Sequence, residues 1–284
     1  MKRLREGEQF QQEKPFVRKS LSKHQSKCKE CDPSFCTYST HVQHATKENP
    51  LLLEEPDQFC ESLFHIFPAP EFGLETHGCI SGETKDNCRP QCLVLIAQFI
   101  SESSSFLGRY TNCRRQHAEQ FMIHDPILLN ILKTETSFHG NLTLFMKYQP
   151  CHHSSGNARI HPEGYLFKNQ CDSRSCTELI ITFFKEKLEP IGVSLTIKCA
   201  SIYKANWEFS KRPDDIATVA KALEGVRMLL KNNILLECVK PCDWVFLASL
   251  AQNINHLHLF SSARLATDNG ISKFFQDQME FCTI

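Results

Sequence analysis

The sequence lacks an excess of charge of either sign, because its 284 residues include 32 Lys and Arg and 32 Asp and Glu. A nucleic acid or an acidic membrane surface would therefore have to be bound by a local patch of the molecule. The sequence also lacks an apolar run as long as a transmembrane helix, and no signal-peptide core follows the charged residues 1–8. We expect a cytoplasmic or nuclear protein without a membrane partner, and secretion only if the true N-terminus differs.

Tryptophan is scarce, with 2 residues, whereas cysteine is abundant, with 15. Such a cysteine density is common in secreted domains that are held together by disulfides. The odd count, and motifs that use at least two cysteines as metal ligands, favour the intracellular interpretation instead.

Residues 1–50 form a basic, polar segment that we expect to be disordered. Within it, Cys28, Cys31 and His44 have the spacing of a C2H2 zinc finger, but Glu48 stands where the second histidine is expected. A structural zinc site needs four ligands, and the alternatives for the fourth are His41 and Cys36. We interpret the motif as a degenerate finger.

Residues 51–284 show the periodicities of one α/β domain. The predicted strands are residues 92–100, 106–110, 142–148, 193–199 and 234–239. The predicted helices are residues 57–67, 116–125, 176–188, 215–230 and 243–252, with a loop at 68–90. This order predicts a five-stranded mixed sheet with helices on its faces.

Two short motifs near the centre of the chain point to metal chemistry. The first is His117-Ala118-Glu119, and the second is Pro150-Cys151 at the end of an apolar strand. A histidine, a glutamate that does not bind the metal, and a later Pro-Cys with one more cysteine form the signature of zinc-dependent base deaminases. The signature has two residues between the Pro-Cys pair and its last cysteine, and here no cysteine stands at that position.

Cys176 is the candidate that we prefer for the last ligand. Ser175 and Glu178 have the spacing of a capping box, which places Cys176 in the first turn of a helix. The positive end of the helix favours the thiolate, which is the form that zinc binds. The alternative ligands are Cys171, His152 and His153.

With these motifs, residues 90–255 resemble the AID/APOBEC-like deaminases. The residues that carry the resemblance are His117-Ala118-Glu119, Tyr148-Gln149-Pro150-Cys151, Cys176-Thr177-Glu178-Leu179, Lys198 to Tyr203, Ala222 to Arg227 and Cys242 to Ala248. The long gap before Cys176 is most similar to a divergent, partly secreted vertebrate branch of novel AID/APOBEC-like deaminases. The resemblance implies a cytidine-deaminase-like three-layer α/β/α fold and suggests a role in immunity.

The resemblance also implies a mechanism, the hydrolytic conversion of cytosine to uracil. A zinc ion held by His117, Cys151 and Cys176 would activate water for attack on C4 of the base, while Glu119 moves the proton. Asn112, with Thr111, is expected to line the substrate pocket, as residues before this helix do in similar enzymes. The alternative is that both residues only complete a turn.

The substrate is expected to be single-stranded DNA or RNA. Residues 203–212 interleave aromatic and basic side chains, and Tyr203 and Trp207 are candidates for stacking on bases. The alternative is that both rings belong to the core. Two other functions stay open: an inactive nucleic-acid-binding protein with a deaminase fold, and a deaminase of free cytidine or deoxycytidylate.

Overall fold

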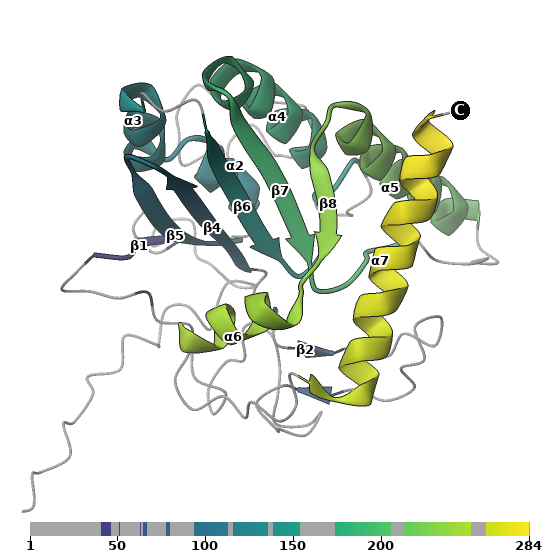
Figure 1. Cartoon of the computed structure of the whole chain (residues 1–284). Coiled ribbons are helices and arrows are strands. Elements are labelled where there is room, and N and C mark those ends of the chain that lie inside the picture. Colours follow the sequence, from purple (N-terminus) through teal and green to yellow (C-terminus); the bar gives the residue numbers. More distant parts are fainter. Residues whose placement is uncertain are drawn as a thin grey trace, which may run out of the picture.

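A mixed β-sheet is the centre of the computed structural model, which describes residues 41–46, 51, 63, 65–66, 78–79, 94–112, 116–135, 139–153, 174–205, 213–250 and 260–283. The order of its six strands is β1-β5-β4-β6-β7-β8. Their bounds are β1 Val42–His44, β4 Val94–Ser101, β5 Ser105–Thr111, β6 Gly140–Met146, β7 Val193–Cys199 and β8 Leu235–Cys238. Figure 1 shows the strands side by side in this order.

The sheet is antiparallel on one side and parallel on the other. β4 and β5 form the predicted hairpin, and both β1–β5 and β4–β6 are antiparallel pairs. β6–β7 and β7–β8 are parallel pairs, whose connections include α4 (Cys176–Phe183) and α5 (Pro213–Lys231). Parallel neighbours need such long crossovers, usually with a helix. The α/β class with a mixed sheet is therefore confirmed.

The predicted strand count was one too low, because β1 comes from the segment that was expected to be disordered. β1 pairs with β5 in the register Val42 to Tyr110, and the Ala45 N–H extends the pairing to the Leu107 carbonyl at 2.9 Å. Its residues are few and mostly polar, so the sequence shows no strand periodicity there. The open edge of β5 and the burial of His41 and Val42 decide its position.

Helices lie on both faces of the sheet. Figure 1 shows α2 (Ala118–Ile123) and α4 behind the sheet and α6 (Pro241–Ser249) in front of its lower end. The C-terminal helix α7 (Ser262–Thr283) packs against the edge strand β8 and against α5. The predicted helix at residues 176–188 is confirmed, with its last part as a π-helical turn, η6 (Phe184–Leu188).

The helix predictions were incomplete in three places. α3 (Pro126–Thr134) starts at the proline that was expected only to end the preceding helix, because Asp125 accepts a hydrogen bond from the Ile127 N–H and proline suits the first helical turn. α7 was not predicted. The predicted helix 57–67 is wrong at its end, because residues 65–66 form strand β2 (His65–Ile66). This strand pairs with β3 (Gly78–Cys79), which lies in the segment 68–90 that was expected to be a loop. Most of residues 57–67 and 68–90 lies outside the described residues.

A buried ion pair fixes the start of α7. Arg264 pairs with Asp268 one turn later and donates to the Ala200 carbonyl oxygen at 2.8 Å. The Trp244 indole donates to Asp268 at 3.4 Å, and the Arg264 guanidinium lies 5.0 Å from the Trp244 ring centre. These contacts join α7 to α6 and to the residue that follows β7, so they hold the C-terminal helix on the domain.

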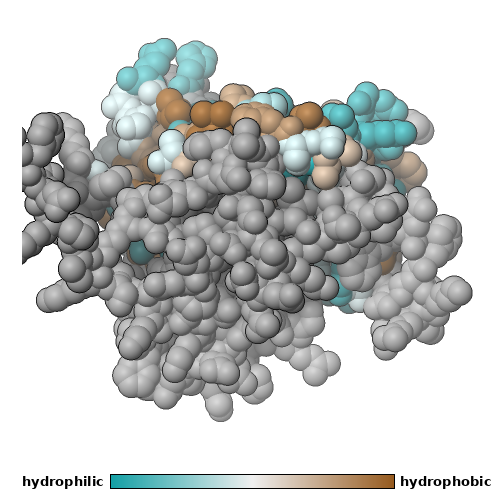
Figure 2. All heavy atoms as spheres, turned by 90° about the horizontal axis from the view of Figure 1, so that it is seen from below, coloured by the Kyte–Doolittle hydropathy of each residue, from teal (hydrophilic) through white to brown (hydrophobic). Residues whose placement is uncertain are grey.

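Apolar side chains gather along one edge of the described surface. Figure 2, seen from below, shows these apolar side chains interspersed with more polar ones, and hydrophilic side chains at both ends of the edge. Exposed large apolar side chains include Val245 of α6 and Leu265 of α7. Among the described helices, none combines the length and the apolar character needed to cross a membrane.

Candidate metal centre

His117 lies at the N-terminus of α2, where two side chains hold the backbone. The Gln120 side-chain oxygen accepts the His117 N–H at 2.9 Å, and the Asn112 side-chain oxygen accepts the Ala118 N–H at 2.7 Å. The first N–H groups of a helix have no partner within the helix, so such acceptors stabilise the turn. They hold the backbone that carries the His117 imidazole.

Cys151 and Cys176 are brought together by hydrogen bonds, although 24 residues separate them in the sequence. The Thr177 N–H donates to the Cys151 carbonyl oxygen at 3.0 Å, and the Thr177 hydroxyl donates to the Pro150 carbonyl oxygen at 3.2 Å. The predicted capping box is present: the Glu178 N–H donates to Ser175 Oγ, and the Ser175 N–H donates to the Glu178 carboxylate. The first turn of α4 is thus attached to the loop after β6.

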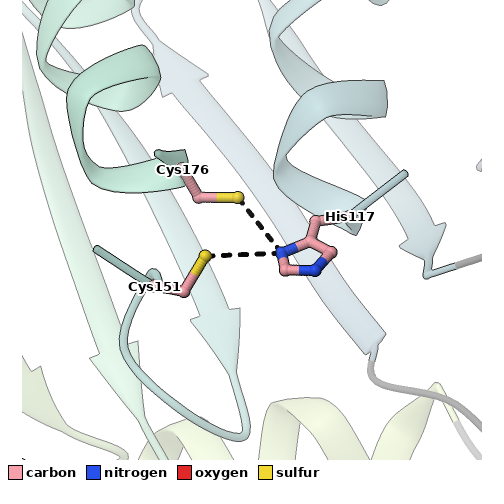
Figure 3. Close-up of side chains that lie close together, drawn as sticks. All are labelled: His117, Cys151 and Cys176. Carbon is pink, nitrogen blue, oxygen red and sulfur yellow. Dashed lines mark hydrogen bonds between the residues drawn. The ribbon is translucent and has the colours of Figure 1, made fainter. Parts of the chain in front are cut away.

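The three predicted metal ligands form one cluster. His117 Nδ1 lies 3.5 Å from Cys151 Sγ and 3.3 Å from Cys176 Sγ, and all three ligand atoms lie within 4.8 Å of one another. Figure 3 shows the side chains pointing toward one another from α2, from the loop after β6 and from α4. Nitrogen and sulfur ligands of a tetrahedral zinc lie about 3.6 Å apart. The cluster therefore has the donor set and spacing of a metal site.

The pKa values of the two thiols are shifted in opposite directions. A hydrogen bond from Cys176 is the main reason why the pKa of Cys151 falls to about 4, and the neighbouring His117 acts in the same direction. The same hydrogen bond, with complete burial, raises the pKa of Cys176 well above its usual range. The thiolate that is favoured without a metal is thus that of Cys151 and not that of Cys176, so the effect expected from the helix start is outweighed by burial and by the hydrogen bond between the thiols. Thiolate is the form that binds a metal.

Glu119 lies beside the cluster and is not one of its ligands. It is 6% exposed, and its burial raises the pKa of the carboxyl group, while the charge of His117 and hydrogen bonding with Cys176 oppose the shift. A carboxyl group next to a metal site can accept a proton and return it, and a raised pKa favours the protonated form. The catalytic role of Glu119 stays a prediction.

Of the predicted substrate residues, the structure describes Asn112 and Tyr203. Asn112 completes the turn before α2 through its bond to Ala118, so the alternative role is present, and substrate contact stays a prediction. Tyr203 lies with its ring 5.3 Å from that of Tyr148. Trp207 lies outside the described residues, as does the alternative ligand Cys171.

Both histidines of the finger-like motif have other partners in the structure. His41 Nδ1 lies 3.0 Å from the Thr111 hydroxyl, and its ring stacks on Phe121. His44 Nε2 lies 2.6 Å from the Asp125 carboxylate. His44 is part of β1 and not of a finger helix. Cys28, Cys31, Cys36 and Glu48 lie outside the described residues.

Gln149 is a site residue that the sequence analysis did not identify. Its side chain makes two hydrogen bonds to the backbone of Tyr203, accepting from the N–H at 2.9 Å and donating to the carbonyl oxygen at 2.7 Å. This pair attaches the loop after β7 to the loop that carries Cys151. A glutamine before a Pro-Cys pair carries no signal for such a contact, because its partner is 54 residues away.

Comparison with known proteins adds no assignment. No family model matches the chain, and a search of the curated proteins finds no match. Any function therefore has to be argued from the cluster and its surroundings.

Proposed function

We propose that the protein is a zinc-dependent deaminase that converts cytosine to uracil in single-stranded DNA or RNA. The observation that carries the proposal is the His117, Cys151 and Cys176 cluster with the buried Glu119 beside it. One imidazole and two thiolates with a nearby carboxyl group that is not a ligand match the zinc deaminase signature.

Zinc is the metal that this donor set favours. Soft thiolates select zinc over magnesium and calcium, and three protein ligands leave a fourth position for water. Bound there, zinc would act as a Lewis acid and lower the pKa of a water molecule toward neutrality. The hydrogen bonds from Thr177 support the same assignment, because they hold both cysteines in place.

Glu119 would carry the proton in this reaction. Its carboxyl group would accept a proton from water, deliver it to N3 of cytosine and then assist the departure of ammonia. Burial favours such a role, since it raises the pKa of the Glu119 carboxyl group and so makes the protonated form easier to reach. The contact with Cys176 keeps the carboxyl group close to the metal site.

A polynucleotide substrate is supported by the loop after β7. The Tyr148 and Tyr203 rings are neighbours, and Lys204 Nζ lies 5.0 Å from the centre of the Tyr203 ring. Aromatic rings next to cations suit stacked bases with their phosphates, and each stacked base contributes about 1 to 3 kcal/mol. Gln149 places this loop against the metal-ligand loop. We therefore expect turnover of single-stranded oligonucleotides and weak action on duplexes, whose bases are stacked.

The test compares Glu119→Gln with the exposed control Glu102→Gln. Glu119→Gln should keep its zinc and its melting temperature but lose at least about 100-fold in uracil formation on a cytosine-containing oligonucleotide. Glu102→Gln should match the wild type. A wild-type protein that binds zinc and oligonucleotide without forming uracil would contradict the proposal and favour the inactive binding protein. Turnover of free cytidine alone would favour the small-substrate enzyme.

A further inference from the structure

A second group of potential metal ligands lies next to Cys151 in the sequence. His152, His153 and Glu178 each offer a ligand atom, and these atoms lie within 4.8 Å of one another. His153 Nε2 lies 3.2 Å from the Glu178 carboxylate. None of these three side chains belongs to the cluster of His117, and the proposed deaminase chemistry does not use them.

The backbone at His153 brings the two adjacent imidazoles together. Consecutive side chains on an extended chain point in opposite directions. His153 instead has φ of 51°, in the left-handed region that few residues other than glycine adopt, and the two ring centres lie 4.9 Å apart. Unusual backbone conformations of this kind cluster at ligand sites. Here the conformation points both rings toward the first turn of α4.

Surrounding residues orient His152 and make room for it. The Ser175 hydroxyl lies 2.9 Å from His152 Nδ1, and a hydrogen bond to the nitrogen that does not bind the metal fixes the ring of a metal-binding histidine. Glu224 of α5 reaches within 3.8 Å of His152 Nε2. A Cβ atom at Gly225 would lie 2.5 Å from His152 Cβ, so glycine is needed for this approach of α5.

We propose that His152, His153 and Glu178 bind a second zinc ion, separate from the one at His117. Two imidazoles and one carboxylate are a common zinc ligand set, and a fourth ligand comes from water or from Glu224. The ion would connect the loop after β6 to α4, which is where the structure has to hold Cys151 close to Cys176. The second site does not depend on the proposed deaminase activity.

Two conservative variants remove ligands without removing the local structure. Glu178→Gln keeps a capping box, because glutamine is accepted at this position, but it replaces the carboxylate. His153→Asn keeps a residue that tolerates positive φ but removes the imidazole. His139→Asn is the matched control, since His139 is exposed and outside both clusters.

The measurement is the zinc content of the full-length protein after dialysis against a buffered low-micromolar zinc solution. Glu178→Gln and His153→Asn should each contain one zinc fewer than the wild type, and His139→Asn should contain the same amount. After cobalt substitution, both variants should keep the sulfur-to-metal charge-transfer band of the cysteine site. If both variants hold as much zinc as the wild type, the second site does not exist. A wild-type protein without deaminase activity would refute the proposed function and leave these zinc counts unchanged.

Discussion

The Thr177 N–H donates to the carbonyl oxygen of Cys151 at 3.0 Å, and this bond joins the two halves of the candidate metal centre. In the signature with two residues between the cysteines, the chain itself keeps both thiols in one turn. Here 24 residues intervene, so hydrogen bonds from Thr177 take over that function. An insertion of this length is compatible with a metal site because loop-closure entropy rises only slowly with loop length.

The ligand assignment predicts different effects for two cysteines. Cys176→Ser should abolish metal binding at the His117 site, because hydroxyl is a poor zinc ligand. Cys242→Ser should retain the metal, since Cys242 is exposed and outside both ligand clusters. Metal analysis and cobalt absorption of both variants check this. Cys171→Ala should also keep the metal, and its loss in that variant would move the third ligand away from Cys176.

Because β1 is part of the sheet, we expect the stability of N-terminally truncated proteins to fall once the deletion includes β1. Removal of residues 1–40 should leave stability and metal content unchanged. Removal of residues 1–46 also removes the buried Val42 and the His44 contact with Asp125, which is fully buried. That deletion should lower the free energy of unfolding by at least about 3 kcal/mol. Urea unfolding of both truncated proteins measures the difference, and equal stability would mean that β1 contributes nothing.

The environment of His41 predicts a pH dependence of stability. Burial, with the nearby charge of Arg109, lowers the pKa of His41 to about 4. The unfolded chain, with an ordinary pKa of about 6.5, then binds more protons than the folded one between these values. Stability from His41 is therefore complete above about pH 6.5 and is lost as the pH falls toward 4, by at most about 3 kcal/mol.

The variant His41→Gln isolates this contribution, because an amide can bond to Thr111 and does not titrate. The difference in unfolding free energy between pH 7.5 and pH 5 should be smaller in this variant than in the wild type. His139→Gln, at an exposed site, should keep the wild-type difference. Parallel pH profiles for His41→Gln and wild type would contradict the assignment.

The close approach of α5 predicts that Gly225 is sensitive to substitution. An added Cβ would lie 2.5 Å from His152 Cβ and 3.1 Å from Thr177 Oγ1, and both atoms lie near the metal-ligand loop. Gly225→Ala should destabilise the protein by about 1 to 3 kcal/mol, although alanine favours the helix. Gly270→Ala in α7 is the control for helix propensity. Thermal unfolding of both variants measures the effect. A Gly225→Ala protein that is more stable than the wild type would show that α5 does not pack tightly against His152.

The sequence by itself determined the larger part of the α/β pattern. The strands after residue 92 and the helices α2, α4, α5 and α6 were predicted because apolar residues recur with the periods of strands and helices. The cluster of His117, Cys151 and Cys176 was also predicted, since the residue types are specific and Ser175 with Glu178 marks the start of α4. Local patterns of this kind need no information about distant residues.

The tertiary structure alone decided the features that join distant segments. β1 is polar and short, and only the open edge of β5 and the buried Asp125 give His44 its position. The Gln149 contact with Tyr203, and the approach of Gly225 to His152, join residues more than 50 positions apart. The candidate metal centre depends on such contacts as well, because the hydrogen bonds of Thr177 hold Cys151 and Cys176 together. Their energy comes from groups that become neighbours only when the chain folds, so no local pattern in the sequence indicates them.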